Sequence, residues 1–140
     1  MTRREALKLA ALALASACVG SKPDAIAYDT DACAFCRMTI SDPRFAASIM
    51  LVKGRTLKFD SIDCLIAYYD QANAAHQIAS VWVDDFRRPG TLIDARSARY
   101  VDLGGGRAPM GGRRGIAAVS SDADAASLGV NRTRSWAELL

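Results

Sequence analysis

The sequence predicts an α+β fold made of two small ββαβ-like units that pack together, with mainly antiparallel strand pairing. Two observations lead to this prediction. Short apolar runs with strand composition alternate with turn residues and with two helix-forming segments. The order of strand, Ser/Asp cap and helix also occurs twice, first in KFDSIDCLIAYY and again in AVSSDADAASLG. Such a repeated unit buries its apolar face against its copy.

The first unit is expected to contain a hairpin, a helix and a third strand. Residues 46–53 and 56–59 have strand composition, and Gly54-Arg55 between them is typical of a turn. Asp60 or Ser61 can cap the helix that follows, which should end by Asn73. Residues 79–86 form the third predicted strand, and the turn residues 88–90 end it. The helix has apolar positions spaced i, i+3, i+4 and i+7: Ile62, Leu65, Ile66 and Tyr69.

The second unit repeats this order with shorter elements. Residues 91–93 and 99–103 are strand-like, and a glycine-rich loop, GGGRAPMGGRRG, separates them from a strand at residues 115–119. A helix should start at residues 120–122 and run to about Leu128, with Gly129 as its C-terminal cap. Residues 135–139 add a last strand or a turn of helix. We therefore predict one folded region, residues 32–140, with halves of about 32–88 and 89–140.

Residues 1–17 have the layout of an export signal peptide. Arg3 and Arg4 precede an apolar run that ends in small residues and is too short to span a bilayer core of about 30 Å. The start resembles a twin-arginine signal, although Ala6 stands where that pattern usually has a large apolar residue. The stretch LASAC resembles a lipobox, which predicts lipidation at Cys18. Residues 18–31 would then be a lipid anchor and tether at the periplasmic face of a bacterial membrane.

The charge balance argues against nucleic acid as a partner. Without residues 1–17 the chain keeps 15 basic and 14 acidic residues, a net charge of +1. A nearly neutral mature domain gives no electrostatic case for nucleic acid as a partner. Its 123 residues are enough for one compact core or two small lobes.

The stretch CAFCRM, residues 33–38, brings two thiols and a thioether close together. A c-type haem would need His in place of Arg37. Structural zinc needs four ligands, and besides the lipidated cysteine the chain offers only Cys33, Cys36, Cys64 and His76. A redox dithiol or a structural Cys33–Cys36 disulfide stays open in an oxidising compartment.

The remaining interpretation is a Cu(I) site. Thiolate and thioether sulfurs are soft donors that suit Cu(I). In an extended segment, Cys36 and Met38 would point to the same side of the backbone. Met110 is the best candidate for a third donor, because its Gly-Pro-rich loop is a poor place for a core residue. Met50, in an apolar strand, is interpreted as a core residue.

These motifs together resemble the NosL family of nitrous oxide reductase accessory lipoproteins. The resemblance includes the lipobox, C-x-x-C-x-M, the strand leading into Phe59-Asp60 and a helix, and the later Pro-Met-Gly. It implies two related ββαβ units and one Cu(I) held by Cys36, Met38 and Met110. It leaves Cys33 as a further candidate ligand or a disulfide partner of Cys36. The family motif commonly has Gly where this chain has Arg37. Cys64, which is not part of the motif, is interpreted as a packing residue.

The function predicted from the sequence is therefore a membrane-anchored, extracytoplasmic Cu(I) chaperone and not an enzyme. The expected recipient is a copper enzyme, with nitrous oxide reductase as the one that the resemblance implies. Two alternatives remain: a thiol–disulfide oxidoreductase that uses Cys33 and Cys36, and a lipoprotein scaffold without metal. The oligomeric state is left open.

Overall fold

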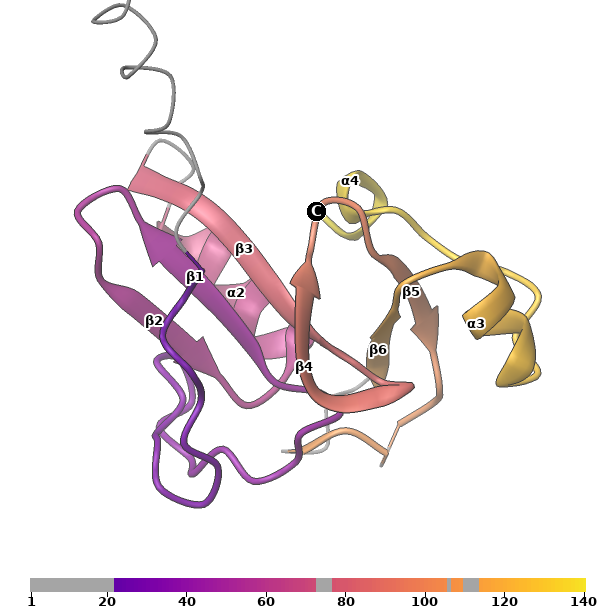
Figure 1. The fold of residues 1–140 in the computed structure, drawn as a ribbon, viewed down its shortest axis with the longest axis horizontal. Helices are drawn as coiled ribbons and strands as arrows, with labels where there is room; N and C mark the ends of the chain where they lie inside the picture. Colours follow the sequence, from indigo (N-terminus) through magenta and orange to yellow (C-terminus); the bar gives the residue numbers. More distant parts are fainter. Residues whose placement is uncertain (1–21, 73–76, 106, 110–113) are drawn as a thin grey trace, which may run out of the picture.

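The computed structural model describes residues 22–72, 77–105, 107–109 and 114–140. Within them the fold is α+β, with one six-stranded, mostly antiparallel sheet and three short helices (Figure 1). The strand order is β2-β1-β3-β6-β5, and β4 pairs with β3 beside this path. The elements are β1 (Ala47–Leu51), β2 (Thr56–Phe59), α2 (Ile62–Ala72), β3 (Ile78–Asp85), β4 (Arg88–Asp94), β5 (Arg99–Asp102), β6 (Ile116–Val119), α3 (Asp122–Ser127) and α4 (Trp136–Leu139).

The first half of the fold has the predicted ββαβ order. β1 and β2 form an antiparallel hairpin whose turn contains Gly54 at φ 87°, a conformation that glycine adopts without strain. β3 returns after α2 and pairs antiparallel with β1, so that Ile49 lies between Leu57 and Val81. The turn predicted at residues 88–90 instead lies at residues 86–87, and β4 begins at Arg88.

The second half repeats the ββαβ order, but a single β-bridge at Arg134 stands in place of its last strand. β5 pairs antiparallel with β6, α3 follows, and the chain returns to pair Arg134 with Tyr100 of β5. β5 is thus the middle strand of its unit, as β1 is in the first. The predicted last element is the helical turn α4, with a capping box between Ser135 and Glu138.

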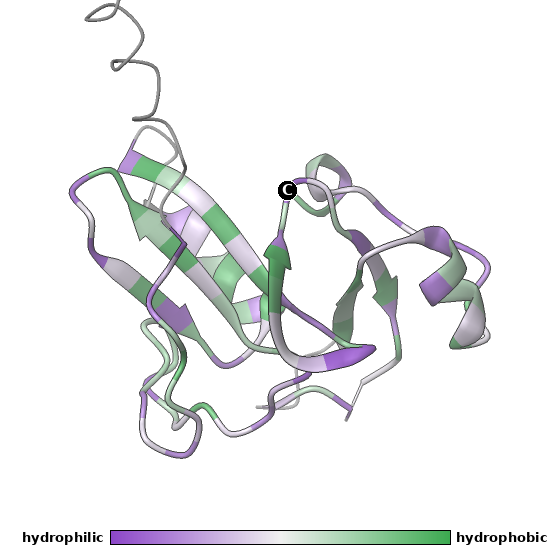
Figure 2. Ribbon diagram, in the orientation of Figure 1, coloured by the Kyte–Doolittle hydropathy of each residue, from purple (hydrophilic) through white to green (hydrophobic). Residues whose placement is uncertain are grey.

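The two cores of the protein lie on opposite faces of the β5–β6 hairpin. Successive strand residues point to opposite faces, and in β6 Ile116 and Ala118 join the cluster with α2 while Ala117 and Val119 join the cluster with α3. In β5, Tyr100 and Val101 divide in the same way. Figure 2 shows apolar residues along the strands and hydrophilic ones at the β3–β4 turn.

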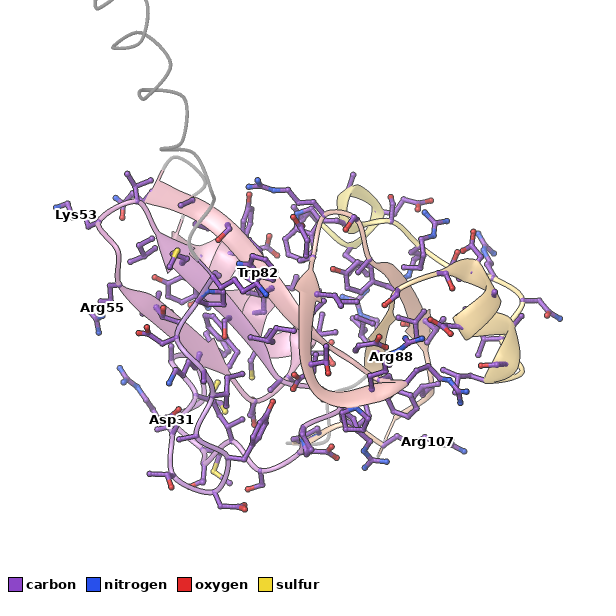
Figure 3. The ribbon with its side chains drawn as sticks, in the orientation of Figure 1. Asp31, Lys53, Arg55, Trp82, Arg88 and Arg107 are labelled. Atoms are coloured by element: carbon purple, nitrogen blue, oxygen red, sulfur yellow. The ribbon has the colours of Figure 1, made fainter. Side chains whose placement is uncertain are left out.

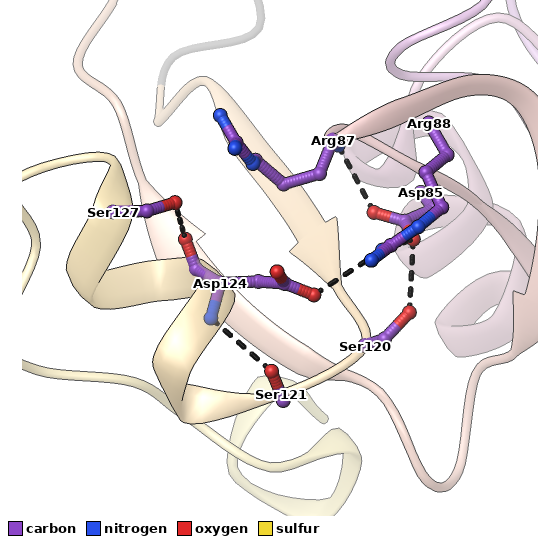
Figure 4. Close-up of polar contacts among 7 residues, drawn as sticks. All are labelled: Asp85, Arg87, Arg88, Ser120, Ser121, Asp124 and Ser127. Atoms are coloured by element: carbon purple, nitrogen blue, oxygen red, sulfur yellow. Dashed lines mark hydrogen bonds and ion pairs between the residues drawn. The ribbon is translucent and has the colours of Figure 1, made fainter.

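Polar contacts around Asp85 connect the two halves (Figure 4). This buried carboxylate, at the end of β3, accepts hydrogen bonds from Arg88 Nη1 at 2.8 Å and from Ser120 Oγ at 2.9 Å. Arg88 Nη1 also lies 3.3 Å from a carboxylate oxygen of Asp124 in α3, whose backbone N–H donates to the cap residue Ser121. At the end of β3, Asp85 also pairs with Ala118 of β6, and this pairing of the two strands is parallel. The ion pairs of Arg88 and the Ser121 cap together hold α3 against the β3–β4 turn.

The segment before β1 covers the edge strand β2. Lys58 Nζ donates to Ala25 O at 2.7 Å and lies 2.6 Å from Asp31 Oδ2, and Asp24 N donates to Thr56 Oγ1 at 3.1 Å. Residues 24–31, predicted as part of the tether, therefore pack on the fold. Within the described residues, no helix has the length and apolar character needed to cross a bilayer.

Candidate metal centre

Residues 33–38 form the tip of a short hairpin. Cys33 N donates to Met38 O at 2.8 Å, and Ala32 and Thr39 form an antiparallel bridge directly before and after. Residues 34–36 are a turn, and Arg37 has φ 69° in the left-handed region. The extended backbone assumed for Cys36 and Met38 is therefore wrong, because the left-handed residue between them breaks the alternation of side chains.

The hairpin tip docks on the end of β2, where α2 begins. Ala34 N donates to Lys58 O at 2.7 Å, a main-chain hydrogen bond to the edge strand. Ser61 Oγ accepts from Cys64 N at 3.1 Å, so Ser61 caps α2 as predicted. Together these contacts bring the first turn of α2, and with it Cys64, against Cys33.

Four potential ligands meet at this point. The sulfurs of Cys33, Cys36 and Cys64 and a carboxylate oxygen of Asp60 all lie within 4.8 Å of one another. All three thiols are free. Cys33, Cys64 and Asp60 are buried, whereas Cys36 is half-buried. In Figure 3, sulfur atoms lie near the labelled Asp31, at the end of the molecule where the hairpin packs on β2.

The three thiols differ in acidity. The pKa of Cys33 is lowered to about 6, first by a hydrogen bond from the Cys64 thiol and further by the backbone N–H groups of Asp60, Cys36 and Phe35, against an opposing effect of burial. One of these donors, Cys36 N, lies 3.5 Å from Cys33 Sγ. The pKa of Cys64 is raised, because its thiol donates to Cys33 and is buried, and burial also raises the pKa of Cys36. Cys33 is therefore the most acidic of the three thiols.

Asp60 is the unusual member of the cluster. It is only 1% exposed, and its Oδ1 has no hydrogen-bond partner within the described part of the chain. The ion pairs identified among the described residues do not include it. A buried carboxylate oxygen without a partner is costly unless a cation or hydrogen-bond donor offsets its desolvation. Asp60 therefore adds an oxygen with free acceptor capacity to a group of soft donors.

Met38 follows Cys36 by two residues in the same hairpin tip and lies at the surface, with 51% of the residue exposed. The adjacent surface hollow is lined by charged residues that include Asp31, Arg37, Arg55 and Lys58. A sulfur in this position is accessible to a docking partner, while the buried thiols are not.

Three residues of the sequence prediction, Cys18, His76 and Met110, lie outside the described residues. The base of the loop that carries Met110 is described. Leu103 N donates to Gly115 O at 3.0 Å and Gly104 N to Arg114 O at 3.2 Å. Asp63, in the first turn of α2, lies near the strand end of this loop. Burial raises the pKa of Asp63, whereas the charge of Arg114 and a hydrogen bond from the backbone N–H of Ile116 lower it. The loop thus starts beside the helix turn that carries Cys64.

Sequence reasoning did not find the full cluster. Cys64 was interpreted as a packing residue and Asp60 only as a helix cap, whereas the fold places both beside Cys33. The available signal was the position of Cys64 in a first helical turn, where thiols are often functional.

The family of the chain follows from a comparison with known proteins. The NosL family model matches residues 25–131, most of the described fold and all of CAFCRM. The chain belongs to the NosL family. The structure is also similar to the crystal structure of the copper chaperone NosL from Shewanella denitrificans, with a TM-score of 0.69 and 22% identity, covering 84% of this chain and 96% of that one. At this identity the likeness shows a shared NosL fold. The comparison with curated proteins gave no match.

Proposed function

We propose that this NosL family member is a Cu(I) chaperone that binds one copper ion at Cys36, Met38 and Met110. The observation that carries this proposal is that one hairpin tip holds the exposed Met38 together with Cys33 and Cys36 of a cluster of three free thiols. Soft sulfur donors select Cu(I) over Mg²⁺ or Ca²⁺. A metal site at the tip of a surface hairpin is open to a partner, as transfer requires.

Copper transfer would proceed by ligand exchange, without bond-making chemistry on a substrate. A thiol or imidazole of the recipient displaces a thioether first, because thioether sulfur is a weaker donor than thiolate. Cys36 releases the ion last. The charged residues around the hairpin, Arg37, Arg55 and Lys58 among them, offer a surface for electrostatic recognition of the recipient.

The proposed place of action is the periplasmic face of a bacterial membrane, where the lipidated Cys18 would anchor the protein. The proposed recipient is a copper enzyme, nitrous oxide reductase. Release of a Cys18→Ser variant into the soluble periplasmic fraction tests the anchor. Transfer is tested by mixing the copper-loaded protein with copper-free reductase, which should gain copper from the parent and not from Cys36→Ser.

The copper site itself is tested by anaerobic competition with a coloured Cu(I) chelator. Replacing Cys36 by Ser should weaken Cu(I) binding by more than about 100-fold, because loss of a ligand exceeds the 10–100-fold effect of losing a ligand's supporting contact. Met110→Leu should weaken it by about tenfold or less, since a thioether contributes less.

Met50→Leu is the matched control. It removes a buried methionine sulfur at the end of β1 that lies farther from the thiol cluster. Parent-like binding by both Cys36→Ser and Met110→Leu would exclude this site.

A thiol–disulfide oxidoreductase remains the second candidate, because Cys33 has a lowered pKa and two thiols beside it. It requires a disulfide that cycles with a measurable potential and an activity that survives Met38→Leu. The hairpin turn at residues 34–36 differs from the helix start that activates thioredoxin-like motifs.

A further inference from the structure

The sulfur atoms around the hairpin are arranged from the surface inward. Met38 is 51% exposed and Cys36 is half-buried, whereas Cys64 is 8% exposed and Cys33 is fully buried. Cys36 connects the two levels, since its sulfur lies within 4.8 Å of both buried sulfurs. The surface donors use only one member of the three-thiol cluster. The other two need a role of their own.

We propose that Cys33, Cys36 and Cys64 form a second, inner position for Cu(I), which shares Cys36 with the surface position. This inference rests on the proposed function, because it takes copper as the cargo. It adds two ligands, Cys33 and Cys64, to those that the sequence pattern indicates. Copper would enter at the exposed Met38 and move inward by exchanging thioether for thiolate ligands, with Cys36 bound throughout.

The spacing of the three sulfurs fits one ion. With metal–thiolate bonds of about 2.3 Å, three sulfurs arranged at 120° lie about 4 Å apart. The observed sulfurs all lie within 4.8 Å of one another. Small side-chain movements are therefore enough to bring them into a common coordination sphere. Three thiolates around Cu(I) form a complete site, so that no further donor is required.

The inner position is held by regular structure. The hairpin hydrogen bond from Cys33 N to Met38 O and the bond from Ala34 N to Lys58 O fix one side. The Ser61 cap fixes the helix turn of Cys64 on the other. Ligands placed by strands and a capped helix lose little conformational entropy on binding.

Asp60 supplies the second observation that points to a cation. Its carboxylate is buried against the three sulfurs, and Oδ1 has no partner among the residues described. A divalent ion that this carboxylate ligates would offset the cost of burying its oxygen, whereas three thiolates more than neutralise Cu(I). Asp60 is therefore not a ligand of Cu(I), and a hard carboxylate suits a soft ion poorly. Zn(II) would instead take Asp60 as a fourth ligand in a tetrahedral site.

The exchange conserves charge and oxidation state. Copper stays Cu(I), and each thiol that becomes a ligand releases its proton to solvent. The thioethers leave unchanged. The result is an ion held by stronger donors and shielded from water, which can return to the surface through Cys36 when a recipient docks.

The experiment uses a background in which both thioethers are absent. The Met38→Leu/Met110→Leu protein, which also carries Cys18→Ser, is titrated anaerobically with Cu(I) against a coloured chelator. It should still bind one Cu(I) with thiolate-to-copper absorption in the ultraviolet. Adding Cys64→Ser should weaken that binding by more than about 100-fold. Adding Met50→Leu, the matched control, should change it by less than about threefold.

The outcomes separate this inference from the proposed function. If the parent binds Cu(I) but the double methionine variant does not, the inner position is excluded and the surface site stands. The same conclusion follows if Cys64→Ser, in a protein shown by circular dichroism to be folded, binds as its background does. If the parent binds no Cu(I), the proposed function fails. Tighter binding of Zn(II) that is lost in Asp60→Asn would overturn the copper assignment of the inner position.

Discussion

At the scale of the residue, the backbone at Arg37 shapes the hairpin of residues 33–38. Its φ of 69° is left-handed, a region that glycine enters freely and that costs other residues about 1–2 kcal/mol. The glycine that the NosL motif commonly has at this position fits such a backbone. The present chain keeps the conformation with a charged side chain at the rim of the site. The departure from the family pattern thus changes the surface and preserves the backbone.

Arg37→Gly should raise the free energy of unfolding by about 0.5–1 kcal/mol. Relief of left-handed strain outweighs the greater entropy that glycine gives to the unfolded chain, about 0.5–1 kcal/mol. Urea unfolding measures the difference. The control is Asp29→Gly, at φ 63°, where the gain should be smaller because aspartate tolerates this region better. A loss of stability in Arg37→Gly greater than in the control would contradict this explanation.

At the scale of the element, the β5–β6 hairpin depends on one close backbone approach. Gly115, directly before β6, has φ 59°, and a Cβ at this position would lie 2.3 Å from Gly104 O. The two glycines stand opposite each other at the base of the loop that carries Met110, where Leu103 N donates to Gly115 O. Only glycine permits this approach. The first and last glycines of the sequence GGGRAPMGGRRG, Gly104 and Gly115, therefore serve the hairpin.

Gly115→Ala should lower the free energy of unfolding by about 2–4 kcal/mol, since it adds a steric clash to left-handed strain. Gly129→Ala is the matched control. It also has positive φ, at 77°, but has no atom within 4 Å of the added Cβ, and should cost only about 1 kcal/mol. Thermal or urea unfolding of both variants provides the comparison. Equal losses of unfolding free energy in the two variants would show that the close approach to Gly104 does not add to the cost at Gly115.

At the scale of the whole molecule, a buried acid connects the segment before β1 to the central strand. Asp84 of β3 is fully buried, and its Oδ2 accepts a hydrogen bond from Tyr28 OH at 2.7 Å. Burial raises the pKa of Asp84 to about 7, although the bond from Tyr28 partly opposes the rise. The folded protein therefore keeps a proton that the unfolded chain releases near pH 4.

The contribution of Asp84 to the stability of the parent should fall as the pH rises from about 4 to about 7 and stay constant above that. In this range the folded state binds more protons than the unfolded state, which makes the slope negative. Because one pKa unit corresponds to about 1.4 kcal/mol, the full effect is a few kcal/mol.

Asp84→Asn should remove this contribution and be more stable than the parent at pH 8, which the difference between the two proteins in urea unfolding at pH 5 and pH 8 measures. Tyr28→Phe is the control, because it keeps the acid and should keep the slope. A parent and an Asp84→Asn variant with the same pH profile would refute the raised pKa.

The sequence by itself determined the local features of this protein. The order of the elements, the cap at Ser61, the helix cap at Ser121 and the soft donors in CAFCRM are encoded within a few residues of each other. Periodicity, capping and turn chemistry act over that range, so that the α+β class and the first ββαβ unit followed from the pattern. The composition of the motif also pointed to soft-metal chemistry, and the family that the motif resembles is the one whose model matches the chain.

Only the tertiary structure decided which distant residues meet. Cys64 and Asp60 join Cys33 because the hairpin docks on the edge of β2 through main-chain hydrogen bonds, which leave no pattern in the side chains. The parallel pairing of β3 with β6, and the reduction of the last strand to the bridge at Arg134, depend likewise on how the halves pack. A contact between residues far apart in the chain is selected by the whole fold, whereas a helix or a turn is favoured by its own residues.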